Sequence, residues 1–152
     1  MPRSVTPPDA PKTPVEARGE KLGLTFSRGR SLSSNSHFSL EAAEFAMEHG
    51  DPWALSRRMF KAYFEDLDDI GTLDGVVRIG AEAGLPADSL RAALEEGHYR
   101  ERVDEGIAWS RKIGVTAIPT FLFNERLALV GAHEIDTFRQ IMDDIGATKT
   151  GT

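Results

Sequence analysis

The sequence contains no cysteine in 152 residues. This absence excludes disulfide bonds, and it excludes any reaction in which a thiolate of this chain is the nucleophile or a metal ligand. It says little about the compartment, because cysteine-free proteins occur in reducing and in oxidising surroundings.

Positive charge and long apolar runs are also scarce. The 18 basic residues are outnumbered by 24 acidic ones, which gives a formal net charge of -6, and no basic patch exceeds Arg57-Arg58. Nucleic acid is therefore not expected as a partner. No apolar run approaches the ~18 residues of a membrane span, and the N-terminus lacks the apolar core of a signal peptide, so we expect no membrane association and a cytoplasmic protein.

What is present is typical of a globular chain, with 40% hydrophobic and 28% charged residues. Composition predicts a flexible Pro-rich arm at 1–14, a helical domain at 15–113, a C-terminal unit of two strands and a helix at 114–147, and a tail at 148–152.

Start and stop signals divide the helical domain. Gly50 ends one apolar-periodic segment, and Asp51-Pro52 opens the next, with a capping acceptor followed by proline at the first helical position. Thr72 can cap a third helix, and Pro86 opens a fourth. A last helix is predicted from about 99 to 113. The pattern predicts a wide apolar stripe on the second helix, formed by Met59, Phe60, Tyr63, Phe64 and Leu67. The rings of Trp53 and Trp109 are expected in the core.

The C-terminal unit begins at a proline. Gly114 ends the last helix, Pro119 leads into an apolar run at 120–123, and a second run at 127–130 follows a turn. Because proline cannot donate to a sheet ladder, Pro119 is expected at the first position of its strand.

The order of these elements carries a resemblance. Gly-Val-Thr-Ala-Ile-Pro-Thr-Phe at 114–121, a hairpin, Val-Gly-Ala at 130–132 and a closing helix resemble the C-terminal half of a thioredoxin-fold protein. More narrowly, they resemble the DsbA-like oxidoreductases of the FrnE type, as do Asn35, the Ala-rich segment 40–46, Phe-Lys-Ala-Tyr-Phe at 60–64 and Ala-Gly-Leu at 83–85. The resemblance implies an α/β, predominantly helical fold: a partial thioredoxin-like (DsbA-like) fold with a helical insertion domain plus a C-terminal β-hairpin and helix. It also implies that the Ile118–Pro119 bond is cis.

The departure from the family concerns its chemistry. In that family a Cys-x-x-Cys at a helix start attacks substrate disulfides, and this chain has neither the cysteines nor a strand–helix–strand unit ahead of the helical region. We therefore expect no catalytic residues and a redox-inert chain, whether as a truncated or as a degenerate thiol–disulfide oxidoreductase or isomerase. Two alternatives stay open: a non-catalytic peptide-binding or dimeric interaction module, and a relative of the glutathione-linked 2-hydroxychromene-2-carboxylate isomerases and kappa-class transferases, which share the Asn35-like position.

The resemblance also places the one candidate site. It implies that the backbone of Ile118, before Pro119, pairs with an extended peptide or protein substrate as an added strand. No cofactor is expected, and no metal, because the four histidines are scattered. If no other strand covers the run at 120–123, its exposed edge favours a homodimer.

Overall fold

The computed structural model describes residue 7 and residues 9–30 and 33–147, and it divides the chain into two compact units, 1–106 and 107–152. Residues 1–6 and 8 of the predicted arm and the tail at 148–152 lie outside the described residues.

The described part of the N-terminal segment is tied to a loop by one arginine. Helix α1 (Pro14–Lys21) is capped by Thr13, which exchanges hydrogen bonds with Glu16 in a capping box. The Arg28 guanidinium donates to the Glu16 carboxylate and to backbone carbonyls of the segment before the helix: Pro7, Ala10, Pro11. These hydrogen bonds attach residues 7, 10 and 11, which belong to the predicted flexible arm, to Arg28.

After α1, the first unit continues with α2 (His37–His49), α3 (Pro52–Phe64), α4 (Leu73–Glu82) and α5 (Ala87–Glu96), and it ends within α6 (Arg100–Lys112). The predicted signals at their boundaries are confirmed. Gly50 follows α2, the Asp51 carboxylate accepts from Trp53 N–H before α3, and the Thr72 hydroxyl caps α4. Helix α6 begins one residue later than the pattern predicts.

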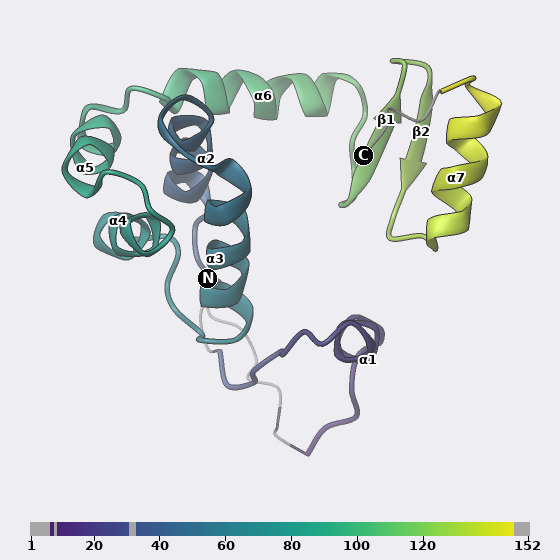
Figure 1. Ribbon diagram of the computed structural model, residues 1–152, viewed down its shortest axis with the longest axis horizontal. Helices are drawn as coiled ribbons and strands as arrows, with labels where there is room; N and C mark the ends of the chain where they lie inside the picture. Colours follow the sequence, from purple (N-terminus) through teal and green to yellow (C-terminus); the bar gives the residue numbers. More distant parts are fainter. Residues whose placement is uncertain (1–6, 8, 31–32, 148–152) are drawn as a thin grey trace. The chain divides into compact units, whose positions relative to one another are not determined.

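The hydrophobic core lies among these helices, and in the described residues every buried apolar side chain falls between 42 and 103. Close contact between α4 and α5 requires a glycine, because a Cβ on Gly80 would lie 2.4 Å from the Leu90 side chain. Figure 1 shows α4 and α5 next to each other in this unit.

Two predictions about burial are wrong. Trp53 is 73% exposed and Trp109 is 54% exposed, so neither ring belongs to the core. Trp53 and Phe60 extend from the side of α3 opposite its buried residues, which are Leu55, Met59, Ala62. Leu67, the last residue of the predicted stripe, lies beyond α3 with a left-handed backbone. Apolar character alone did not indicate which side of α3 other helices cover.

The second unit begins within α6 and then contains a hairpin and a further helix. Strands β1 (Thr120–Phe123) and β2 (Leu127–Val130) pair antiparallel, with Thr120 opposite Val130 and Phe123 opposite Leu127. Asn124 and Glu125 at the turn both have positive φ, the geometry of a type I′ hairpin turn. Helix α7 (Ile135–Asp144) lies along the hairpin (Figure 1).

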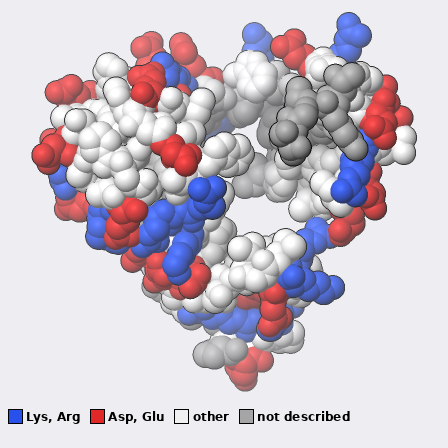
Figure 2. Space-filling view, viewed as in Figure 1, with Lys and Arg blue, Asp and Glu red and all other residues white. Residues whose placement is uncertain are grey.

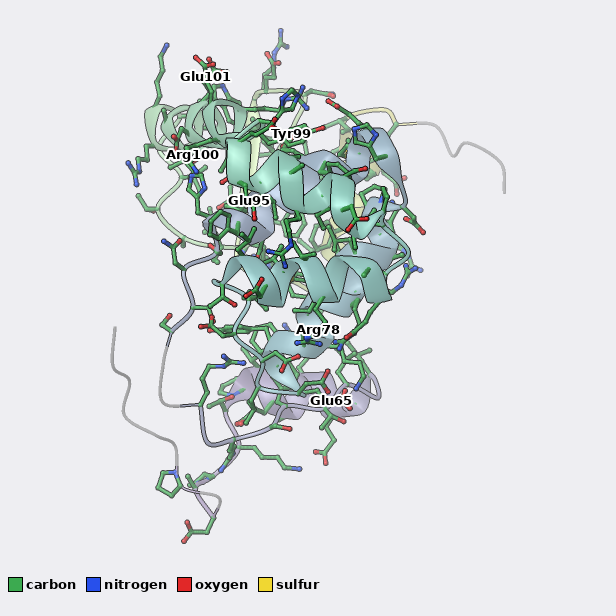
Figure 3. The ribbon with its side chains drawn as sticks, turned by 90° about the vertical axis from the view of Figure 1, so that its left-hand side faces the viewer. Glu65, Arg78, Glu95, Tyr99, Arg100 and Glu101 are labelled. Atoms are coloured by element: carbon green, nitrogen blue, oxygen red, sulfur yellow. The ribbon has the colours of Figure 1, made fainter. Side chains whose placement is uncertain are left out.

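Charges of both signs share the surface. Figure 2 shows Lys and Arg interspersed with Asp and Glu on the face in view, and many are paired, as Arg78 is with Asp68 and Glu82. Figure 3 places Arg78 on α4, and Tyr99, Arg100 and Glu101 where α6 begins. Across the described ranges, no helix has the length and apolar character needed to cross a membrane.

Candidate functional site

The loop before β1 is positioned by the end of α6. Gly114 has φ +82°, and its N–H donates to the Arg111 carbonyl while Val115 N–H donates to that of Ser110. These two bonds form a Schellman motif, which satisfies the last carbonyls of the helix and turns the chain out of it. Glycine is suited to this position because it adopts positive φ without steric cost.

The two predicted site residues lie together in this loop. The Ile118–Pro119 peptide bond is cis. The Ile118 side chain is 90% exposed, the largest exposure among the large apolar residues of the described part. The Thr120 hydroxyl donates to the Ala117 carbonyl at 2.7 Å and so closes the loop against the start of β1.

The register of the hairpin defines which backbone groups of β1 face outward. In an antiparallel pair, positions bonded to the partner strand alternate with positions whose N–H and C=O groups point away from it. Pro119 occupies a position bonded to the partner strand, because Gly131 N–H donates to its carbonyl at 2.8 Å. The backbone groups of Thr120 and Leu122 therefore point away from β2, and β1 has no second strand partner in the described residues.

Helix α7 covers one face of the hairpin. The Phe121 and Phe123 rings lie 4.8 and 6.4 Å from that of Phe138 on α7, so they occupy the covered face. Since side chains alternate along a strand, Thr120 and Leu122 lie on the other face. Leu122 is 40% exposed, and the outward edge of β1 is therefore bordered by apolar surface.

The outward groups of this edge have the chemistry of a strand edge, and the sequence supplies no thiolate for disulfide exchange. The sequence has no thiol, and the outward groups are main-chain donors and acceptors, which suit an added strand. No group of three or more His, Asp or Glu side chains able to hold a metal occurs in the part of the chain that the structure describes.

Sequence reasoning missed a cluster of charged groups in the first unit. The Glu41 side chain is buried, and its Oε1 lies 2.9 Å from Nδ1 of His37, while Nε2 of the same ring lies 3.1 Å from Oδ1 of Asp104 on α6. The hydrogen bond to Asp104, followed by that to Glu41, raises the pKa of His37 above its ordinary value. Oε2 of Glu41 has no hydrogen-bond partner among the described residues.

The i, i+4 spacing of His37 and Glu41 could have indicated their pairing. Asp104 gives no such signal, because it lies 67 residues away in sequence.

A second group of contacts joins α2 to the start of α6. The Tyr99 hydroxyl donates to Glu48 at 2.8 Å, and Arg102 pairs with Glu44 and Glu48. Burial, assisted by the Glu48 carboxylate, raises the pKa of Tyr99. Tyr99 and Arg102 therefore hold the start of α6 against α2.

Comparison with known structures defines the class of fold. A crystal structure of a probable DsbA oxidoreductase from Streptomyces coelicolor superposes with a TM-score of 0.77 at 22% identity, covering 91% of this chain and 60% of that one. The fold is therefore DsbA-like and thioredoxin-related, α/β and predominantly helical, as the sequence predicted.

The family follows from the sequence comparison. The family model for the DSBA-like thioredoxin domain matches residues 13–143, and the chain belongs to this family. The uncharacterized protein YwbO of Bacillus subtilis (strain 168) is 26% identical over 135 residues, which are 88% of this chain and 67% of that protein. The chain thus spans three fifths of the length of the solved structure and two thirds of that of YwbO.

Proposed function

We propose that this chain supplies the peptide-binding part of a DsbA-type thiol–disulfide oxidoreductase, and that its 152 residues bind an extended polypeptide without exchanging disulfides. The observation that carries the proposal is the exposed Ile118–Pro119 loop, which leads directly into outward backbone groups at Thr120 and Leu122. The family relationship supports the substrate class, an extended segment of another protein.

The binding step follows from main-chain chemistry. An extended peptide beside β1 would exchange N–H···O=C bonds with Thr120 and Leu122, and the Ile118 side chain would cover one of its apolar residues. Such bonds make little demand on sequence, while the neighbouring apolar surface favours β-branched and aromatic side chains.

The thiol step needs a cysteine that these residues do not contain. Disulfide exchange begins when a thiolate attacks a sulfur of the substrate, and the chain offers no such group. The activity proposed for these 152 residues is therefore binding, and the oxidoreductase role is that of the protein class.

Binding can be tested by fluorescence anisotropy with a labelled peptide of alternating Val and Thr. We expect saturable binding to the wild-type chain and a loss of affinity of about tenfold or more in Ile118→Asp, because a carboxylate would replace the apolar contact and lose hydration.

The matched control is Ile135→Asp. Ile135 is 60% exposed in the same unit but lies at the start of α7, where a carboxylate is tolerated. Equal affinity of both variants and wild type, or the absence of any binding, would contradict the proposal.

A further inference from the structure

The outward edge of β1 is unusually free of the features that keep strand edges apart. Natural sheets protect such edges with charged residues, prolines or bulges. The strand Thr-Phe-Leu-Phe contains none of these, and its register with β2 is unbroken. Pro119 does not protect this edge. Its carbonyl accepts from Gly131 N–H on β2, so the N–H that proline lacks would also have pointed toward β2 and not outward.

The edge is also complementary to itself. When two copies of β1 run antiparallel about a two-fold axis through Phe121, Thr120 of each lies opposite Leu122 of the other. Those are the positions whose N–H and C=O groups point outward, so each pair exchanges two hydrogen bonds. The strand carries no charge, so no like charges oppose each other across the axis.

An added strand would also support a weak sheet. A two-stranded hairpin is marginal in water, and three or more strands give independent stability. Here the hairpin has α7 on one face only, and no side chain of the second unit is fully buried among the described residues. A four-stranded sheet of order β2-β1-β1-β2 would satisfy the outward groups and extend the apolar face that carries Leu122.

We propose that a second copy of this chain pairs with β1 through Thr120–Phe123, forming a two-fold dimer that covers the peptide-binding edge. The regulatory consequence rests on the proposed function: dimerisation and peptide binding use the same donors and acceptors and therefore exclude each other. Peptide affinity should then fall as the protein concentration rises, by mass action.

The first test is the mass in solution, measured by light scattering after size-exclusion chromatography over a range of micromolar concentrations. The wild-type chain should approach twice its monomer mass as concentration increases. Leu122→Pro should stay monomeric, because it removes an N–H that points outward and makes no bond within the hairpin.

Ala128→Pro is the matched control. Ala128 lies opposite Leu122, so its N–H also points away from the partner strand, but on the outer side of β2. Both substitutions remove an outward N–H at the same distance from the turn. The Ala128→Pro variant should dimerise like wild type; a monomeric wild type, or equal loss of the dimer in both variants, would overturn the proposal.

The register can be tested directly, because the chain has no cysteine of its own. Phe121→Cys should form a disulfide-linked dimer on mild oxidation, since non-hydrogen-bonded antiparallel pairs have Cα atoms ~4.5 Å apart, within the range of a disulfide. Phe123→Cys also removes a ring next to Phe138 but places its sulfur far from the axis. Equal cross-linking of both variants would exclude this register.

These results separate the two proposals. A monomer that binds the labelled peptide would overturn the dimer and leave the proposed function standing. A wild-type dimer that dissociates on dilution to a monomer, when that wild-type monomer binds no peptide, would overturn the proposed function and leave the dimer standing. Peptide binding that is unaffected by a tenfold rise in protein concentration would contradict the shared edge.

Discussion

At the scale of single residues, His37 has surroundings that the sequence did not predict. Its ring lies between a buried carboxylate on its own helix and the Asp104 carboxylate on α6. The charged ring is favoured there, because it can donate one hydrogen bond to each carboxylate. The folded state thus binds a proton at His37 more tightly than the unfolded chain does.

This difference predicts how stability depends on pH. A group with a raised pKa contributes stability that is fully present below the unfolded value, near 6.5, and is lost as the pH rises through the folded value. The free energy of unfolding of His37→Asn should therefore fall below that of wild type by up to about 1 kcal/mol at acidic pH, with a smaller difference in alkaline solution. Urea unfolding across this pH range measures both.

Asp104→Asn provides the comparison, because the hydrogen bond to Asp104 is the largest cause of the raised pKa. It should remove much of the same pH dependence. A stability difference between wild type and His37→Asn that does not change with pH would contradict the assignment.

At the scale of elements, local signals predicted where helices begin and end. Gly50, Asp51-Pro52, Thr72 and Gly114 act through neighbouring backbone groups, so the sequence carries the information within a few residues. The exposure of Trp53 could not be predicted in the same way, because it depends on which side of α3 the other helices cover.

Glycines within two helices lead to a prediction about packing. Gly80 faces Leu90 so closely that Gly80→Ala should destabilise the first unit by about 1–3 kcal/mol through overpacking of α4 on α5. A Cβ added to Gly106, in α6, would meet no described atom within 4 Å other than those of its chain neighbours and its own helix backbone, so Gly106→Ala should stabilise by up to about 1 kcal/mol through helix propensity.

Thermal unfolding of both variants by circular dichroism tests this difference. Helix propensity favours alanine at both positions. A lower melting temperature for Gly80→Ala and a higher one for Gly106→Ala would therefore isolate the packing effect. A stabilising Gly80→Ala would show that α4 and α5 can separate at little cost.

The turn of the hairpin supports a further prediction at this scale. Glu125 has φ +55°, a backbone region in which residues other than glycine are strained by roughly 1–2 kcal/mol. Glu125→Gly should therefore stabilise the hairpin, although the greater freedom of glycine in the unfolded chain reduces the gain. Amide exchange in β1 and β2, slower in the variant than in wild type, would confirm the effect; faster exchange would contradict it.

At the scale of the whole molecule, the sequence predicted the fold and the loop that holds Ile118 and Pro119, but not every contact that supports the structure. The fold follows from a succession of local patterns in a characteristic order. The contacts of Arg28 with Pro7 and Ala10, and of His37 with Asp104, join residues far apart in sequence and have no local signature.

The absence of cysteine makes a prediction for the whole 152-residue chain. With no thiolate to attack a disulfide, it should not accelerate the reduction of insulin by dithiothreitol. Turbidity should rise at the rate of a buffer control, with a thioredoxin as the positive reference. Faster reduction that follows the protein through purification would require chemistry other than thiol exchange.

The exposure of the two tryptophans determines what optical spectroscopy will report. Trp53 lies in the first unit and Trp109 in the second, and both rings are more than half exposed in the folded chain. Their fluorescence should resemble that of indole in water before and after denaturation, so emission wavelength will be a poor indicator of unfolding. The same exposure makes the rings sensitive to added quenchers, and Trp53→Phe would leave Trp109 as a single emitter that reports on the second unit alone.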